Sequence, residues 1–242
     1  MSSEDNRATA TVSDYYRGLA EAARAVVEKS TSETYVAQLG AAHAAIRELD
    51  HWRQALDAIG EVPTLAVVVE EYQYAVHSAT EGLYRACYSA LRVCLEFALA
   101  TIQFASDDIA FREWQRGARD INWSGLASEE TGVMSARYAC SYFAELKGEV
   151  KEFRGRSIAA YRQYSEHIHA NPRTHSMSPV LQLDHGRYTA FLECLPEFHA
   201  IVNFFLFVRF ARQLGAAERE CLQEQVMDRI GHIPAVRAHF EM

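Results

Sequence analysis

Three side chains within residues 154–176 can together bind an anion and transfer a proton near neutral pH. Arg162 is followed by His167 after four intervening residues and by His169 after six. On a regular helix Arg162 and His169 nearly share a face, whereas His167 lies about 140° away from Arg162. An Asn-Pro stop at 171–172 places both histidines in the last turn, where the helix dipole favours a protonated imidazole. Arg162, His167 and His169 are therefore the candidate catalytic residues.

The same residues also have a structural interpretation. An arginine near the end of a helix can pair with a neighbouring carboxylate such as Glu166. Histidines that precede a Pro stop often cap the last carbonyl groups of the helix. The spacing alone leaves both interpretations open, so the flanking sequence has to be considered.

The flanking sequence resembles the HEPN superfamily of all-helical proteins, whose ribonuclease members carry an arginine followed four to six residues later by a histidine. Residues 161–165 read YRQYS and residues 167–171 read HIHAN, which is similar to the ending of several HEPN-like bacterial families. The stretches 84–104 and 111–121 are similar to what precedes that ending. The resemblance covers about residues 75–215. The position after the arginine, often Asn, Asp or His in active members, is Gln163 here.

The resemblance implies metal-independent endoribonuclease activity. In this reaction the ribose 2′-hydroxyl attacks the adjacent phosphate, a histidine accepts the proton, and an arginine stabilises charge on the phosphate oxygens. HEPN sites usually form across a dimer interface, because two copies supply both the base and the acid. We expect a homodimer that leaves a 2′,3′-cyclic phosphate and a 5′-hydroxyl. We favour His169 as the proton-transfer group and His167 as a supporting phosphate donor.

The resemblance also implies a biological setting, which is that of a toxin or an antiviral-defence effector. Its substrate would be RNA, and an antitoxin or another regulatory protein could restrain it. The same groove could instead serve a catalytically silent helical module that binds a partner protein or a nucleotide. These two functions, one enzymatic and one of binding alone, remain alternatives at the level of sequence.

Local charge is consistent with contact to an RNA backbone. Residues 147–175 hold six basic and three acidic side chains, a local balance of +3 that leaves −11 for the rest of the chain. A basic island of this kind suits phosphate contacts, although a solvated charged face has the same composition. Trp114 and Trp123 could stack on bases or pack in the bundle. The candidate RNA-binding residues are Lys151, Arg154, Arg156 and Arg173.

Three further polar residues are candidates for a supporting role. Arg92 and Glu96 are spaced i, i+4 and are expected to form an ion pair on a helix. The HEPN resemblance would place this pair beside the site, where it would orient Arg162. Gln163 is the third supporting candidate, because it occupies the polar position after the arginine.

A metal site is a weaker alternative. Glu166 and His169 have the Glu-x-x-His spacing of di-iron carboxylate bundles, but such sites need two copies of the motif and two further glutamates. One copy is present, and the choice of Glu81 or Glu96 as additional donors has no support in the spacing. The sequence has neither a glycine-rich phosphate loop nor an HExxH motif. We therefore expect no metal and no cofactor.

The elements that must hold these residues are predicted to be helices. Gly (12) and Pro (5) are scarce, and apolar residues recur at helical spacing through most of the chain. The predicted fold class is all-α, a HEPN-like helical bundle with an N-terminal helical pair packed on it. We divide the chain into a flexible tail at 1–12, the helical pair at 13–60, the bundle at 64–215, and a C-terminal helix and tail at 216–242. Within the bundle, helices are predicted at 64–104 with a division at Gly82, at 133–153, at 157–170 and at 187–214.

Composition and charge indicate a globular cytoplasmic protein. The 242 residues carry a net charge of −8, which disfavours a nonspecific nucleic-acid coat, and 49% of them are hydrophobic. Five scattered cysteines without a CxxC motif are typical of reduced thiols in a cytoplasm. The polar N-terminus has no apolar core of a signal peptide. The apolar stretch at 200–211 is too short to span a bilayer and predicts a buried core helix, so no membrane partner is expected.

Overall fold

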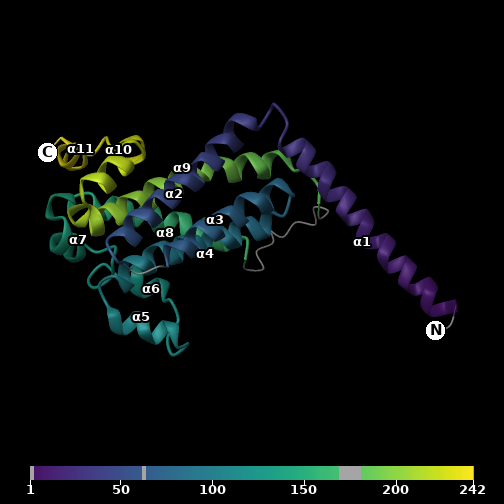
Figure 1. The fold of residues 1–242 in the computed structure, drawn as a ribbon, viewed down its shortest axis with the longest axis horizontal. Coiled ribbons are helices and arrows are strands. Elements are labelled where there is room, and N and C mark those ends of the chain that lie inside the picture. The colour runs from purple at the N-terminus through teal and green to yellow at the C-terminus, as the bar shows by residue number, and fades with distance from the viewer. Residues whose placement is uncertain (1–2, 62–63, 169–180, 242) are drawn as a thin grey trace.

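The computed structural model describes residues 3–61, 64–168 and 181–241, and in these ranges the chain is helical without any strand. The prediction of an all-α helical bundle is confirmed (Figure 1). The α-helices, with two 3₁₀ turns, are α1 (Ser3–Ser30), α2 (Val36–Ala58), α3 (Leu65–Thr80), α4 (Tyr84–Phe104), α5 (Asp108–Gln115), α6 (Trp123–Leu126), α7 (Ala136–Tyr142), η1 (Ala144–Leu146), α8 (Val150–Glu166), α9 (His185–Phe210), η2 (Ala211–Gln213), α10 (Ala216–Ile230) and α11 (Pro234–Phe240).

Helix α9 forms the centre of the bundle and packs against α2, α3, α4, α7, α8 and α10. Its second half, from Phe198 to Phe210, is buried on every side. Most of these residues are apolar, and a helix with apolar residues on all sides belongs in an interior. Pro196 lies inside α9, and the helix continues through it although a proline usually kinks or breaks a helix.

Two helices pass a test of length and composition for crossing a membrane, namely Tyr84–Phe104 and His185–Gln213. The structure buries 67% of the most apolar window in the first and 78% in the second. Core helices of a globular bundle have this burial, because neighbouring helices cover the apolar side chains. The prediction that residues 200–211 form a buried core helix is confirmed.

Side-chain caps fix the starts of several helices. The Asp184 carboxylate accepts a hydrogen bond from the Arg187 backbone N–H at the start of α9. Asp107 and Ser135 cap α5 and α7 in the same way. These caps satisfy backbone N–H groups that have no partner within the helix, and each is worth about 1 kcal/mol.

The chain ends differ from the sequence-based expectation. Helix α1 begins at Ser3, so residues 3–12 are helical where a flexible tail was predicted. The helix projects from the bundle and meets it only at its C-terminal end (Figure 1). There Val26 and Ser30 are buried, and the Ser30 hydroxyl donates to the Thr80 carbonyl at 2.8 Å. Of the predicted helical pair, therefore, α2 packs along the bundle and α1 does not.

The C-terminal segment also folds further than predicted. Residues 234–240, expected in a tail, form α11, and Pro234 occupies its first turn, where a fixed φ favours helix. The His239 ring is buried edge-on between the rings of Phe143 and Phe207. These aromatic contacts supply the tertiary packing that a seven-residue helix needs.

The predicted helix at 133–153 is divided in the structure. Helix α7 ends at Tyr142, and α8 starts only at Val150. Phe143 leaves the helical region, with φ −148° and ψ 80°, and its buried ring lies 5.4 Å from that of Phe207. Burying this ring stabilises the fold more than continuing the helix would. The boundary that was predicted between helices at 153–157 instead lies inside α8, and the break comes earlier, at Phe143.

Gly82 joins α3 to α4 at the division that the sequence predicted. Its φ is +76°, and a Cβ at this position would lie 2.7 Å from the Gln182 carbonyl oxygen. We expect Gly82→Ala to destabilise the fold by at least ~2 kcal/mol, because left-handed strain and a backbone clash add. Gly60 is the matched control, since it has φ +74° and a Cβ there would meet no described residue within 4 Å, and Gly60→Ala should cost only about 1–2 kcal/mol. Urea unfolding measures both, and equal losses would contradict the close approach to Gln182.

Candidate functional site

The candidate site lies on α8, a helix that presents one face to α4 and α9 and the other to solvent. Its buried face includes Phe153, Ala160 and Tyr164, spaced by seven and four residues. Phe153 stacks on Phe204 of α9 with ring centroids 3.8 Å apart and planes at 6°. This packing holds the helix firmly and fixes which residues point outward.

Arg162 lies on the exposed face of α8 and makes no hydrogen bond or ion pair with any described residue. Lys151 is exposed on the same helix. Eleven residues separate the two, which places them within about 20° of each other and roughly 16 Å apart along the axis. The outer face of α8 therefore carries two exposed cations in line.

His167 is the C-terminal cap residue of α8 and is half-buried. Its ring stacks on the buried ring of Tyr88 from α4, with centroids 3.9 Å apart and planes at 12°. This contact turns the imidazole toward the bundle, while Arg162 points outward. The divergence agrees with the angle of about 140° expected from their spacing. His169 and Arg173 lie outside the described residues.

Two of the candidate RNA-binding arginines are engaged inside the protein. Arg154 donates from Nε to the Ala127 carbonyl at 2.7 Å. Arg156 forms a two-pronged pair with Glu197 of α9, at 2.7 Å for both contacts, and covers the Phe153 ring at 4.2 Å. The hydrogen bonds that Arg156 donates to the Glu197 carboxylate raise the pKa of Arg156. Sequence spacing could not reveal this pairing, because Glu197 lies 41 residues away on another helix.

The supporting pair of Arg92 and Glu96 forms as expected from its spacing, at 3.3 Å. Arg92 also donates to the Tyr161 hydroxyl at 2.5 Å and lies over its ring at 4.7 Å. The other face of Tyr161 stacks on Trp123 at 3.8 Å. Arg92 of this pair therefore contacts Tyr161, the residue that precedes Arg162 in the sequence. Tyr161 and Trp123 thus join Arg92 and Glu96 in one cluster. The tyrosine that opens the 161–165 motif was the feature of the sequence that pointed to this cluster.

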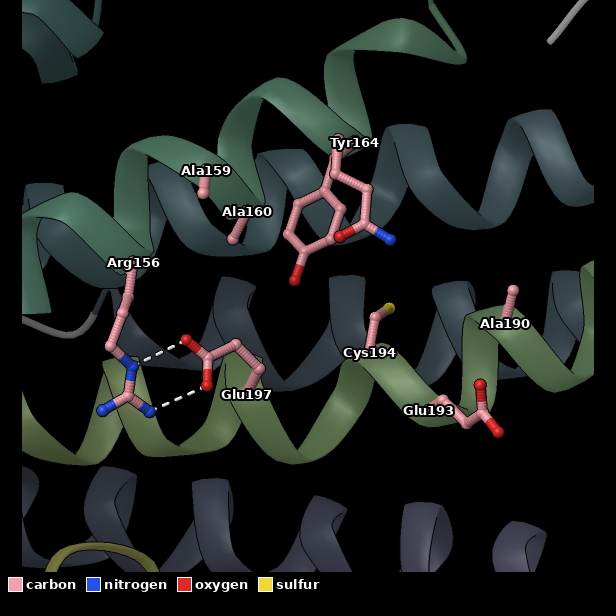
Figure 2. A pocket seen from close by; sticks show the side chains of 9 residues that line it. Arg156, Ala159, Ala160, Tyr164, Ala190, Glu193, Cys194 and Glu197 are labelled. Atoms are coloured by element: carbon pink, nitrogen blue, oxygen red, sulfur yellow. Dashed lines mark hydrogen bonds and ion pairs between the residues drawn. The ribbon is translucent and has the colours of Figure 1, made fainter. Parts of the chain in front are cut away.

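A groove of about 480 Å³ lies between α8 and α9 (Figure 2). The Arg156–Glu197 pair stands at one end, and Gln163 and Glu193 line it as well. Two carboxylates and one guanidinium give the groove a negative balance, which disfavours a phosphate chain inside it. An RNA backbone would find its cations on the outer face of α8 instead.

Two protic side chains line the buried wall of the groove. Burial raises the pKa of the Cys194 thiol to about 12, so the thiol is protonated near neutral pH. Burial likewise raises the pKa of the Tyr164 hydroxyl. Neither group is activated as a nucleophile, because each has its ionised form disfavoured.

The described residues contain no group of three or more His, Cys, Asp or Glu side chains arranged to hold a metal ion. Of the two glutamates considered as donors, Glu96 pairs with Arg92, and Glu81 lies 3.6 Å from His77. Comparisons of the chain with protein families, with curated proteins and with solved structures find no match.

The pairing of Arg156 leads to a prediction about its role. We expect Arg156→Ala to lower the free energy of unfolding by about 1 kcal/mol, because the pair with Glu197 and the cover over Phe153 are both lost. RNA affinity should change less in Arg156→Ala than in Lys151→Ala, because the Lys151 side chain is exposed. Thermal unfolding and filter binding measure the two effects. An unchanged stability together with a larger loss of RNA affinity would assign Arg156 to the RNA contact.

Proposed function

We propose that the protein is a metal-independent endoribonuclease of the HEPN type. The observation that supports this most is the state of Arg162. Its neighbours Arg154 and Arg156 on α8 are held by partners within the fold, whereas Arg162 is exposed without an ion pair to any residue in the described ranges. A solvent-facing guanidinium can offer two donors to the oxygens of a phosphate.

The proposed reaction is an internal transfer at one phosphate. The 2′-hydroxyl oxygen bonds to phosphorus as its proton passes to a histidine, and the bond from phosphorus to the 5′-oxygen breaks. A second histidine gives the departing oxygen a proton. Arg162 stabilises the charge on the phosphate oxygens. The products are a 2′,3′-cyclic phosphate and a 5′-hydroxyl, and no water is consumed in this step.

A homodimer is part of this proposal. Arg162 and His167 diverge on one helix, so one copy does not bring both to the same point. In a twofold dimer whose axis passes near residues 162–169, each copy supplies groups that the other needs. We assign proton transfer to His169 and a supporting phosphate contact to His167. The setting we propose is a cytoplasmic toxin or antiviral-defence effector, restrained by an antitoxin or regulatory protein.

Purified protein should cleave RNA in the presence of excess EDTA, because the proposed chemistry uses protein groups alone. The product ends should be a 2′,3′-cyclic phosphate and a 5′-hydroxyl, read by mass spectrometry. Sedimentation equilibrium on the same sample should report a dimer at micromolar concentration. Activity that disappears on chelation and returns with iron or manganese would instead favour a metal-containing bundle.

The groove favours a second candidate function, that of a catalytically silent module that binds a partner protein or a nucleotide. Glu193 and Glu197 give it a negative lining suited to a basic segment of a partner protein rather than to a nucleotide phosphate. This function would replace the first if the wild-type protein cleaves no RNA and Arg162→Ala or His169→Ala strongly lowers the melting temperature.

A further inference from the structure

A second cavity lies on the other side of α9, among α2, α3, α9 and α10. Its volume of about 280 Å³ is near the lower limit for small-molecule sites, which is roughly 300 Å³. Exposed Gln38 and Ala41 stand among its lining residues, so the cavity opens to solvent along α2. Its apolar wall includes Ala42, Ala45, Leu192, Leu195 and Pro196. The alanines leave the space, since larger side chains at these positions would fill it.

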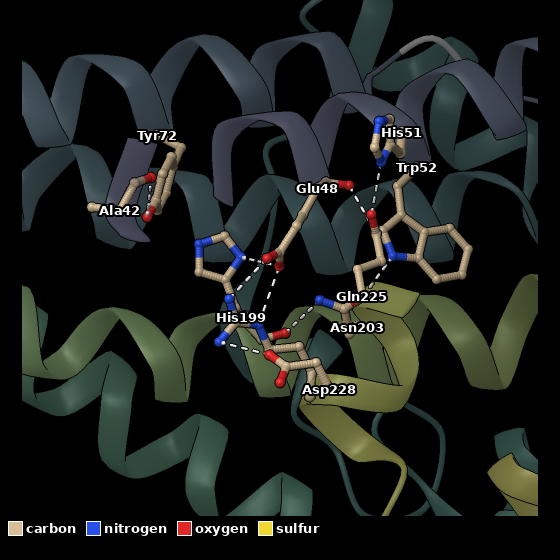
Figure 3. A network of polar contacts seen from close by, with 10 residues as sticks. Ala42, Glu48, His51, Trp52, Tyr72, His199, Asn203, Gln225 and Asp228 are labelled. Carbon is tan, nitrogen blue, oxygen red and sulfur yellow. Dashed lines mark hydrogen bonds and ion pairs between the residues drawn. The ribbon is translucent and has the colours of Figure 1, made fainter. Parts of the chain in front are cut away.

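His199 lines this cavity, and its buried ring lacks hydrogen-bond partners among the described residues. The side chain is 1% exposed, and neither ring nitrogen has a hydrogen-bond partner among the described residues. A Glu48 carboxylate oxygen lies 4.0 Å from Nδ1, beyond hydrogen-bond range (Figure 3). Buried polar groups in native proteins almost always have partners, so this ring has room for one that the chain does not supply.

Buried neighbours contact both the backbone and the ring of His199. Trp52 donates from its indole to the Asn203 side-chain oxygen at 2.8 Å, and the Asn203 amide donates to the His199 carbonyl at 2.9 Å (Figure 3). The ring of Tyr72 meets the imidazole edge-on at 4.8 Å. Burial lowers the pKa of His199 to about 3, so the imidazole is neutral and offers one donor and one acceptor.

The proline in α9 adds a second polar group to the same wall. Pro196 has no N–H, so the Leu192 carbonyl cannot receive the hydrogen bond that a helix normally gives it. Both residues line the cavity. The Leu192 carbonyl, which is seven residues or about two helical turns from His199, therefore lacks its usual helical donor.

The charged residues around the cavity determine what it excludes. Arg229 lines it but is bound by both carboxylate oxygens of Glu48, at 3.1 and 2.8 Å. Its charge is therefore already compensated, and Glu193 adds a negative charge at the edge. An anion would be repelled by these carboxylates, and a cation would meet the guanidinium.

We propose that this cavity binds a small, uncharged, mainly apolar molecule whose hydroxyl or amide group hydrogen-bonds to His199. The alanine-lined walls suit a flat ring, and the neutral imidazole suits a group that both donates and accepts. The site is separate from Arg162 and His167, so the proposal does not depend on RNA cleavage.

Phenol and toluene are matched probes for this site, because they share a ring and differ in the hydroxyl group. Saturation-transfer NMR should show that phenol binds more tightly than toluene, and that benzoate, which is an anion, does not bind. In His199→Phe, phenol should bind about three- to tenfold more weakly, the loss expected for one neutral hydrogen bond. The affinity for toluene should not fall.

Two controls make the test decisive. His199→Phe removes the unpaired nitrogens and keeps a flat ring, so its melting temperature should not decrease. Ala41→Phe adds bulk at an exposed lining position on α2 and should weaken both probes without touching His199. The proposal would be overturned if phenol does not bind the wild type, if it binds His199→Phe equally well, or if Ala41→Phe leaves the binding of both probes unchanged.

Discussion

Arg162→Ala is expected to lower the rate of RNA cleavage by at least about 10²-fold, while the melting temperature stays unchanged. The exposed guanidinium makes no contact that holds the fold together within the described ranges, so its loss should leave stability intact. Its loss removes the donors that stabilise charge on the phosphate in the transition state, and one such donor is worth about 10²–10³ in rate. Single-turnover cleavage of a labelled RNA, with calorimetry of the same preparations, measures both quantities.

Arg137 on α7 provides the matched control, because it is also an exposed arginine on a helix. Arg137→Ala should cleave RNA like the wild type. His169→Ala should lose about 10²–10⁴-fold in rate, as expected for a proton-transfer group, and His167→Ala should lose less. If Arg162→Ala and both histidine variants cleave as fast as the wild type, the ribonuclease proposal is wrong.

Phe204→Ala is expected to destabilise the protein by about 3–5 kcal/mol, a large part of the stability of an ordinary domain. Phe204 is fully buried in α9, stacks on Phe153 of α8 at 3.8 Å, and meets Phe205 edge-on at 5.1 Å. Truncation leaves a cavity at the contact that positions α8, and the helices around it cannot close the space. Guanidinium unfolding monitored by circular dichroism gives the difference.

Phe111 on α5 is the comparison for this change. It is only partly buried and packs on a small separate cluster with Phe104 and Trp114. Phe111→Ala should therefore cost clearly less than Phe204→Ala. Similar losses at the two positions would mean that the contact between α8 and α9 is less important than its geometry indicates.

The helical spacing of apolar residues and the positions of residues that end helices, such as Gly82, predicted most of the fold. The division between α3 and α4 follows from Gly82, and the central position of α9 follows from the mainly apolar composition of its second half. The break at Phe143 was missed, because it depends on a contact with Phe207 that is 64 residues away in sequence. Local propensity cannot report a tertiary contact that overrides it.

The sequence indicated which residues belong to the candidate site, but not which partners those residues have in the fold. The spacing of Arg162 and His167 correctly predicted that they diverge on one helix. The same reasoning named Arg154 and Arg156 as candidate RNA-binding residues, although each has a partner from a distant segment. His199 was not considered at all, since an unpaired nitrogen is a property of the packed interior and leaves no trace in spacing.

The projecting helix α1 has a consequence for how the chain unfolds. At 28 residues it is roughly 42 Å long, and its buried anchors lie in the last turns, at Val26 and Ser30. Helices gain most of their stability in water from packing, and residues 11–18 of α1 are exposed, so these turns depend on local propensity. The cooperative unit of the protein therefore begins near Val26. The preceding turns can melt, be clipped or carry an attached label without loosening the bundle.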